Sequence, residues 1–210
     1  MPEKLYGLTS GKILRAAAKL FSESGYHKIT TREIAQDSGI NVASIYYYFP
    51  SKADILKNLY EFYSIELKKA LPDINELLIL AETDPPHEVL MKAECHFTGD
   101  VRGFLDQILI TAAREICADS ESERFIRENI FAPTSNILKP LLLRMIELGR
   151  IKPFDVETFL SITTYYGFSA AALNNSVFGN SPERYRADFS FMFSLITPVE
   201  NTAKSAKNIP

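Results

Sequence analysis

A short run of small and polar residues, Asn41-Val42-Ala43-Ser44, combines side chains that suit contact with the edges of nucleic-acid bases. An asparagine amide or a serine hydroxyl can hydrogen-bond to a base or to a phosphate. Valine and alanine are small enough to permit close approach, and both can contact a thymine methyl group. If this run opens a helix, the N-terminal end of that helix has the chemistry needed to read the DNA major groove.

Cationic and phenolic side chains flank this run. Arg32 precedes it, and a guanidinium group can donate two hydrogen bonds to O6 and N7 of a guanine. Tyr46 and Tyr47 follow it, and their hydroxyls suit phosphate oxygens while their rings cover sugar and methyl surface. Lys52 lies at the predicted start of a further helix, where an ammonium group and free backbone N–H groups can bind a phosphate. The segment 32–52 therefore predicts binding to DNA.

The surrounding residues predict two short helices joined by a tight turn. Thr30 and Glu33 have the spacing of a capping box, which starts the first helix, and Gly39 supplies the turn that ends it. Asn41 caps the second helix, residues 42–48, and Pro50 ends it because proline disfavours helical geometry in the preceding residue. This arrangement is typical of a helix-turn-helix.

A longer helix before this pair is expected to supply the core on which it packs. Residues 12–22 carry one apolar stripe with a period of 3.6 residues, formed by Ile13, Leu14, Ala17, Leu20 and Phe21. Gly25 suits the left-handed residue that often ends a helix. The residues expected to pack against this stripe from the two short helices are Ile34, Ala35, Ile45 and Phe49.

Charge divides the chain in the same place. Residues 1–58 carry eight Lys and Arg against five Asp and Glu, a net charge of +3, whereas the whole chain of 210 residues has a net charge of -3. A basic head on an acidic body indicates that the head is the part that meets a polyanion.

The stretch from Ile13 to Leu56 resembles the DNA-binding domain of the tetracycline-repressor-like (TetR) family of bacterial transcriptional regulators. Several features occur together at the family's spacing, namely Phe21 before Gly25-Tyr26, Thr30-Thr31, Ile34-Ala35, Gly39, Ile45-Tyr46 and Tyr48-Phe49-Pro50-Ser51-Lys52. The resemblance covers roughly the first quarter of the chain, and the remaining residues match no motif.

This resemblance implies a homodimer whose two heads occupy successive major grooves of a palindromic operator. It assigns base reading and phosphate contact to Thr31, Arg32, Asn41, Val42, Ala43, Ser44, Tyr46, Tyr47 and Lys52. Many members carry a longer or different residue at positions 43 and 44, so the preference for particular bases stays open. Repression, with release by a small-molecule effector, is what the resemblance implies for function.

The chain is expected to be all-α, with a DNA-binding domain at residues 1–54, an effector-binding and dimerisation domain at 55–200 and a flexible tail at 201–210. Helical patterns cover residues 55–70, 89–98, 101–118, 122–149, 156–178 and 182–196. The last two resemble the family's dimerisation helices. On the final helix the expected apolar stripe consists of Phe189, Met192, Phe193 and Ile196, and the preceding helix offers small residues at 169–172.

An effector site is expected among the middle helices, because concave apolar sites between helices are the usual place for ligands. The candidate residues are Phe97, Phe104, Gln107, Ile108, Arg114, Tyr165, Tyr166, Phe168 and Asn174. The supply of aromatic rings favours a lipophilic or flat effector. For each of these residues, packing in the core or a surface ion pair is the competing interpretation.

Other classes of protein fit the sequence less well. No apolar run approaches the length of a membrane span, no secretory signal is recognised, and two cysteines fit a reducing cytoplasm, with Cys117 expected in the core. The group His87, Glu94, Cys95 and His96 lacks the spacing of a zinc site, and no catalytic motif occurs, so neither a metal, nor a cofactor, nor an enzyme is predicted.

Two alternatives stay open. The body could serve only for dimerisation or for a protein partner, without sensing a small molecule. Alternatively, the chain could be a helical enzyme or binding protein with an incidental helix-turn-helix. The sequence does not determine the effector, the operator, the regulated genes, the sign of regulation or the number of dimers on each operator.

Overall fold

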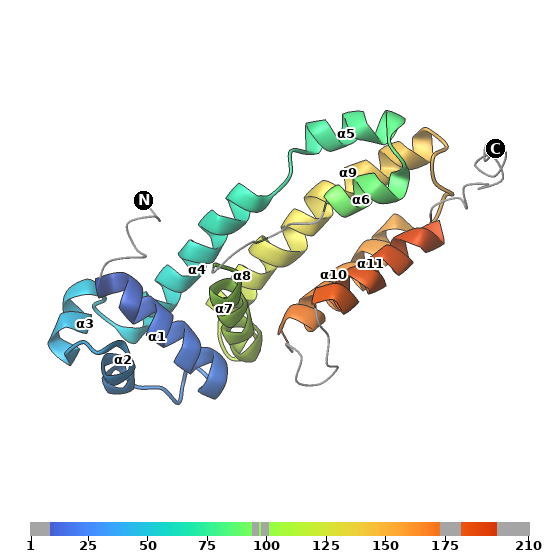
Figure 1. Cartoon of the computed structure of the whole chain (residues 1–210). Coiled ribbons are helices and arrows are strands. Elements are labelled where there is room, and N and C mark those ends of the chain that lie inside the picture. Colours follow the sequence, from blue (N-terminus) through green and yellow to red (C-terminus); the bar gives the residue numbers. More distant parts are fainter. Residues whose placement is uncertain (1–8, 94–96, 98–100, 173–181, 197–210) are drawn as a thin grey trace, which may run out of the picture. The chain divides into compact units, whose positions relative to one another are not determined.

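The computed structural model describes residues 9–93, 97, 101–172 and 182–196, and the regular elements within these ranges are all helical. In chain order they are α1 (Thr9–Ser24), α2 (Thr31–Ser38), α3 (Val42–Tyr48), α4 (Lys52–Ala70), α5 (Ile74–Thr83), α6 (Pro86–Lys92), α7 (Val101–Glu115), α8 (Ser120–Ile126), the π-helix η2 (Arg127–Phe131), α9 (Ala132–Glu147), α10 (Val156–Ala172) and α11 (Pro182–Ile196) (Figure 1). The all-α fold class predicted from the sequence is confirmed.

The chain forms two compact units. The first comprises Met1–Leu71, Cys95–Pro133 and Gly167–Gly179, and the second comprises Pro72–Glu94, Thr134–Tyr166 and Asn180–Pro210. Helices α1 to α4 therefore share the first unit with α7, α8 and η2, whereas α5, α6 and α11 belong to the second. The helices with the predicted DNA contacts are thus packed together with helices from the middle of the chain.

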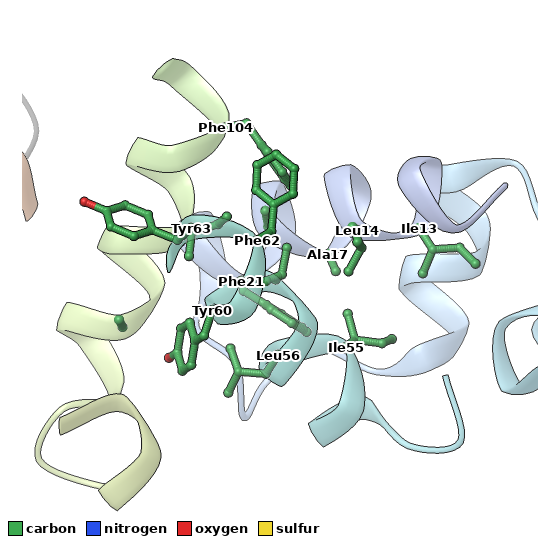
Figure 2. Close-up of a cluster of buried hydrophobic side chains, with 14 of the residues drawn as sticks. Ile13, Leu14, Ala17, Phe21, Ile55, Leu56, Tyr60, Phe62, Tyr63 and Phe104 are labelled. Atoms are coloured by element: carbon green, nitrogen blue, oxygen red, sulfur yellow. The ribbon is translucent and has the colours of Figure 1, made fainter. Parts of the chain in front are cut away.

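The core of the first unit is built mainly by α1, α4 and α7. Figure 2 shows the labelled side chains of this cluster, which are Ile13, Leu14, Ala17 and Phe21 from α1, Ile55, Leu56, Tyr60, Phe62 and Tyr63 from α4, and Phe104 from α7. Phe21 is completely buried, and burying a phenylalanine side chain contributes about 1.5–3 kcal/mol. The apolar stripe predicted for α1 is thereby confirmed, apart from Leu20, which is half-buried at the edge of the cluster.

The predicted helix-turn-helix is confirmed at the level of its caps. The Thr30 hydroxyl accepts a hydrogen bond from the Glu33 amide while the Glu33 carboxylate accepts one from the Thr30 amide, which is a complete capping box. Gly39 adopts a left-handed conformation with φ 68°, and its amide bonds back to the end of α2. Ile34, Ala35, Ile45 and Phe49 are buried, as predicted.

The predicted helix over 122–149 is divided differently. Asp119 caps α8, and the hydrogen bonding then widens to the π pattern of η2 before α9 begins. Pro133 follows directly after Ala132 and lacks the N–H that would bond to the Asn129 carbonyl in a regular helix, which accounts for the irregularity at this place.

Other boundaries also differ from the prediction. Helix α6 starts earlier than expected because Pro86 suits the first turn of a helix, and it ends at Lys92. Helix α5 is not among the predicted segments. The predicted end of α10 at 178 and the polar tail lie outside the described residues. Cys117 is exposed rather than buried, since it follows the last residue of α7 in a turn.

The second unit buries an aromatic group between α10 and α11. Phe159 lies 6.3 Å from Phe193, and Tyr166 lies 5.9 Å from Phe189, measured between ring centroids. Phe189, Phe193 and Ile196 are all buried within this unit. The stripe that was expected to form a dimer contact on α11 therefore supplies the unit's own core. The same helix carries further apolar residues on its other side, and the sequence pattern did not show which of the two sides would be buried.

Candidate nucleic-acid interface

Helix α3 presents three consecutive tyrosines to solvent. The exposed fractions are 50% for Tyr46, 83% for Tyr47 and 42% for Tyr48, and the rings of Tyr47 and Tyr48 meet edge to face at 5.2 Å. Ile45, on the opposite side of the same helix, is completely buried. The core therefore fixes the rotation of α3 about its axis, and that rotation exposes the phenolic hydroxyls.

Some side chains at the N-terminal end of α3 are already engaged within the protein, either in the helix cap or in the core. The Asn41 side-chain oxygen accepts a hydrogen bond of 2.7 Å from the Ser44 amide, which commits this oxygen in part to the cap and leaves the NH₂ donors for a base. Val42 is half-buried against the core of the first unit and Ser44 is half-buried, whereas Ala43 is exposed. Of the four residues predicted to meet bases, Asn41 and Ala43 are thus the two that are exposed.

Helix α2 supplies two further predicted contacts. The Thr31 hydroxyl lies 3.1 Å from the Tyr46 hydroxyl, which ties the first turn of α2 to the exposed side of α3. Arg32 is exposed in the same turn. Hydrogen bonds from the Thr30 amide and hydroxyl lower the pKa of the Glu33 carboxyl, so this acid stays ionised and committed to the cap. The structure therefore brings Thr31 and Tyr46 together, and it leaves their sequence neighbours Arg32 and Tyr47 exposed.

Lys52, which is predicted to contact a phosphate, makes contacts inside the first unit. Its ammonium group donates hydrogen bonds of 2.9 Å to the carbonyls of Tyr26 and Ile29, and it lies 4.3 Å from the centroid of the Tyr26 ring. Burial lowers the pKa of this ammonium, while the carboxylates of Glu115 and Glu33 oppose that shift. In this structure Lys52 holds the loop between α1 and α2.

Glu115 is a residue of this region that sequence reasoning missed. It is the last residue of α7, only 6% exposed, and its carboxylate accepts a hydrogen bond from the Tyr26 amide and pairs with the His27 imidazole. No local pattern marks it, because its partners lie some 90 positions earlier in the chain.

The residues predicted to line an effector site are distributed over both units of the chain. Phe104 and Ile108 are buried in the core of the first unit, where Phe104 packs against Phe62 at 5.2 Å. Arg114 is exposed and donates a hydrogen bond to the Glu23 carbonyl. Gln107 is half-buried, with its carbonyl accepting a bond from Thr111.

The aromatic members of that set are divided between the two units. Phe97 and Phe168 are half-buried in the first unit, where Phe168 lies 6.2 Å from Phe131 of the π-helix. In the second unit Tyr165 is exposed, and the Tyr166 hydroxyl donates to the Asp188 carboxylate. Asn174 lies outside the described residues.

Within the described part of the chain, no three His, Cys, Asp or Glu side chains are grouped so as to hold a metal ion. No helix in the same residues is long and apolar enough to cross a membrane. His87 is exposed, and Glu94, Cys95 and His96 lie outside the described residues.

Comparison with known proteins gives the same assignment for the head. Residues 13–59 match the model of the family described as bacterial regulatory proteins, tetR family. The probable HTH-type transcriptional regulator YttP of Bacillus subtilis (strain 168) is 38% identical over 71 residues, which cover 32% of this chain and 34% of that protein. The HTH-type transcriptional regulator HbdR of Aromatoleum sp. (strain CIB) is 39% identical over 64 residues, covering 29% of this chain and 28% of that protein. The chain thus spans about a third of the length of these relatives.

Solved structures extend the likeness in fold to most of the chain. The TetR family regulator PfmR from Thermus thermophilus superposes with a TM-score of 0.60 at 23% identity, covering 87% of this chain and 95% of that one. A TetR family regulator from Agrobacterium tumefaciens gives a TM-score of 0.62 at 23% identity and covers 94% and 100%. Residues 13–59 thus form a DNA-binding head of the TetR family of bacterial regulatory proteins, and the described helices share the fold of solved TetR family regulators.

Proposed function

We propose that the chain is a sequence-specific DNA-binding regulator that represses transcription in the cytoplasm as a homodimer on a palindromic operator, and that a small-molecule effector releases it. In this assignment residues 1–54 carry the DNA contacts, and residues 55–200 serve dimerisation and effector binding. The observation that carries the proposal is the exposure of Tyr46 and Tyr47 on α3, opposite a fully buried Ile45.

The DNA contacts follow from that exposure. The hydroxyls of Tyr46 and Tyr47 can reach phosphate oxygens, and Arg32 can reach either a guanine or a phosphate. Ala43 is the small exposed residue that lets the start of α3 approach base edges. Thr31 contributes by orienting the Tyr46 hydroxyl through their 3.1 Å contact. In this proposal the tyrosines position the protein on the DNA backbone, and Arg32 together with the start of α3 selects the bases.

Dimerisation is supported by apolar side chains left exposed on α10 and α11. Ile162 and Tyr165 lie one turn apart on α10, with exposed fractions of 58% and 62%. Phe191 and Leu195 lie one turn apart on α11, with exposed fractions of 63% and 66%. Covering large apolar side chains is favourable at about 25 cal/mol per Å² of buried area, so a second copy of the chain has a reason to pack on these helices.

Effector binding is assigned to the half-buried aromatic residues of the first unit, Phe97, Phe131 and Phe168. They pack at the edge of its core rather than inside it, so a ligand could replace solvent over their exposed parts. Phe131 belongs to η2, and π-turns are found frequently at functional sites. Aromatic rings suit a lipophilic or flat ligand.

The experiment that tests the proposal is selection of bound duplexes from a random DNA pool at about physiological salt. The expected result is a palindrome with half-sites about 34–36 Å apart, one helical turn of DNA. Arg32→Ala, run in parallel, is expected to relax the preference at one position in each half-site. Binding without sequence preference, or none, would contradict the proposal. With the selected operator in hand, small molecules that raise the melting temperature are then tested for release of the DNA.

A further inference from the structure

The loop that joins α1 to α2 is held from outside by two charged residues. It begins at Gly25, whose φ of 90° favours glycine, and ends at Thr30, the cap of α2. On one side, the two carboxylate oxygens of Glu115 are shared between the Tyr26 amide and the His27 imidazole, each at 3.1 Å. The loop backbone thus finds a partner at the end of α7 instead of within its own sequence.

Lys52 holds the same loop from the start of α4. Its two hydrogen bonds to the carbonyls of Tyr26 and Ile29 satisfy both ends of the four-residue segment between Gly25 and Thr30. The Tyr26 ring lies beneath the ammonium group and meets the Phe21 ring edge to face at 5.2 Å. The amide of Tyr26 is therefore bound from α7 and its carbonyl from α4.

The held loop leads directly into the residues assigned to DNA. Ile29 precedes the cap Thr30, which starts α2, and the next residue, Thr31, contacts the Tyr46 hydroxyl on α3. A continuous series of bonded groups thus runs from Glu115 through the loop to the exposed face of α3. The Glu115 carboxylate is therefore one of the contacts that fix the loop before α2, beside the two hydrogen bonds from Lys52 and the burial of Ile29.

We propose that Glu115 is a positioning residue for DNA recognition: from α7 it sets the loop at Tyr26-His27 and thereby the placement of α2 and α3 on the operator. This inference rests on the proposed function. Glu115 itself makes no DNA contact, so its removal should weaken recognition of the correct sequence without weakening the attraction to phosphates.

Other charged groups near this contact do not replace it. Arg114, the neighbour of Glu115, is exposed and donates to the Glu23 carbonyl at the end of α1. The Asp119 carboxylate is occupied by the amide and hydroxyl of Ser122. A carboxylate as buried as Glu115 needs charged or donating partners, and the loop supplies them.

The experiment compares Glu115→Ala, Glu115→Gln and the matched control Glu128→Ala, an exposed glutamate of the same unit. Binding to the selected operator and to a scrambled duplex is measured by fluorescence anisotropy, at a temperature where circular dichroism shows each variant folded. We expect Glu115→Ala to lose about tenfold in operator affinity. Binding to the scrambled duplex and its salt dependence should stay unchanged, because no phosphate contact is removed. Glu115→Gln, which keeps an acceptor for the Tyr26 amide, should recover part of the loss.

An unchanged ratio of operator to scrambled affinity in folded Glu115→Ala would overturn the inference, as would an equal loss on both duplexes. If Glu115→Ala does not fold, hydrogen exchange of the peptide covering residues 22–38 in Glu115→Gln decides. Faster exchange there than in the wild type supports the role, and unchanged exchange refutes it. A wild-type protein that binds no operator would refute the proposed function instead, and the exchange measurement would still report on the loop.

Discussion

Two regions of this molecule expose large side chains, and they do so with different chemistry. On α3 the exposed side chains are Tyr46, Tyr47 and Tyr48, each with a hydroxyl at its tip. On α10 and α11 they are Ile162, Tyr165, Phe191 and Leu195, of which only the tyrosine carries a polar atom. We refer to these as the tyrosine face and the apolar face.

The difference indicates what each face is suited to contact. Phenolic hydroxyls keep hydrogen-bonding capacity after the ring is covered, which suits a wet, charged partner such as a nucleic acid. Aliphatic and phenyl groups gain mainly from the exclusion of water, which suits a dry contact between proteins. The exposed fraction of a side chain therefore does not by itself indicate its partner. The polar atom at the end of the side chain distinguishes a nucleic-acid contact from a protein contact.

The largest expected effect comes from placing a charge on the apolar face. Phe191→Asp should raise the dissociation constant of the dimer by about 100-fold or more, because an aromatic anchor is lost and a carboxylate must be buried. Sedimentation velocity over a concentration series measures this. Ile79→Asp is the control, since Ile79 is 70% exposed on α5 and is not assigned to the contact. An unchanged dissociation constant of the dimer in Phe191→Asp would show that the apolar face does not mediate self-association.

The next effect concerns the tyrosine face. Tyr47→Ala should weaken operator binding about tenfold and leave the slope of affinity against salt nearly unchanged, because a neutral hydroxyl on a phosphate releases no counterion. Tyr47→Phe isolates the hydroxyl. Tyr165→Ala is the matched control, a tyrosine that is also largely exposed but lies on the apolar face. Above the dissociation constant of the dimer, this control should bind the operator normally, and a loss equal to that of Tyr47→Ala would contradict the comparison.

Tyr60 differs from the tyrosines of both faces because its hydroxyl is buried. The Tyr60 hydroxyl lies 2.7 Å from Ser122, and its ring stacks on Phe125 at 4.2 Å. Tyr60→Phe keeps the stacking and should cost about 1 kcal/mol of unfolding free energy, measured by urea denaturation near neutral pH. DNA affinity should not change at temperatures where the variant is folded.

The stability of the protein at alkaline pH gives a second test of the burial of the Tyr60 hydroxyl. Burial raises the pKa of Tyr60 above its ordinary value of 10.0, so the folded chain keeps a proton that the unfolded chain loses. The stabilisation is therefore fully present below pH 10 and is lost as the pH rises above it. Wild type should accordingly lose stability more steeply than Tyr60→Phe above about pH 10. Parallel curves would show that the hydroxyl is more hydrated than the structure indicates.

The smallest effect is expected at the cap of α2, beneath the tyrosine face. Thr30→Ala should cost about 1 kcal/mol, while Thr30→Ser should restore most of it because the hydroxyl is kept. The pKa of Glu33 is lowered by Thr30, so the capping contribution is present above the ordinary pKa of 4.5 and is lost as the pH falls through the lowered value. Urea denaturation near pH 7 and near pH 3 checks this. An equal loss of unfolding free energy at both pH values would show that the Glu33 carboxylate does not contribute to the cap.

Features that depend on neighbours in sequence were predictable. The capping box at Thr30, the Asn41 cap, the turn at Gly39 and the buried Ile45 follow from residues within a few positions of one another. Helix α11 has the predicted bounds, because Pro182 begins it at a position where a missing N–H costs nothing. Short-range backbone geometry is enough to decide all of these.

The sequence by itself determined the helical class, the helix-turn-helix and the family of the head at residues 13–59. Tertiary structure alone decided how Lys52 and Glu115 are used, since both act on a loop at residues 26–29 whose partners come from α4 and α7. It also decided which apolar side of α11 is buried, with Phe193 inside and Phe191 outside. The physical reason is shared: a side chain's type states what it can bind, but only the packing of distant segments determines what lies within its reach.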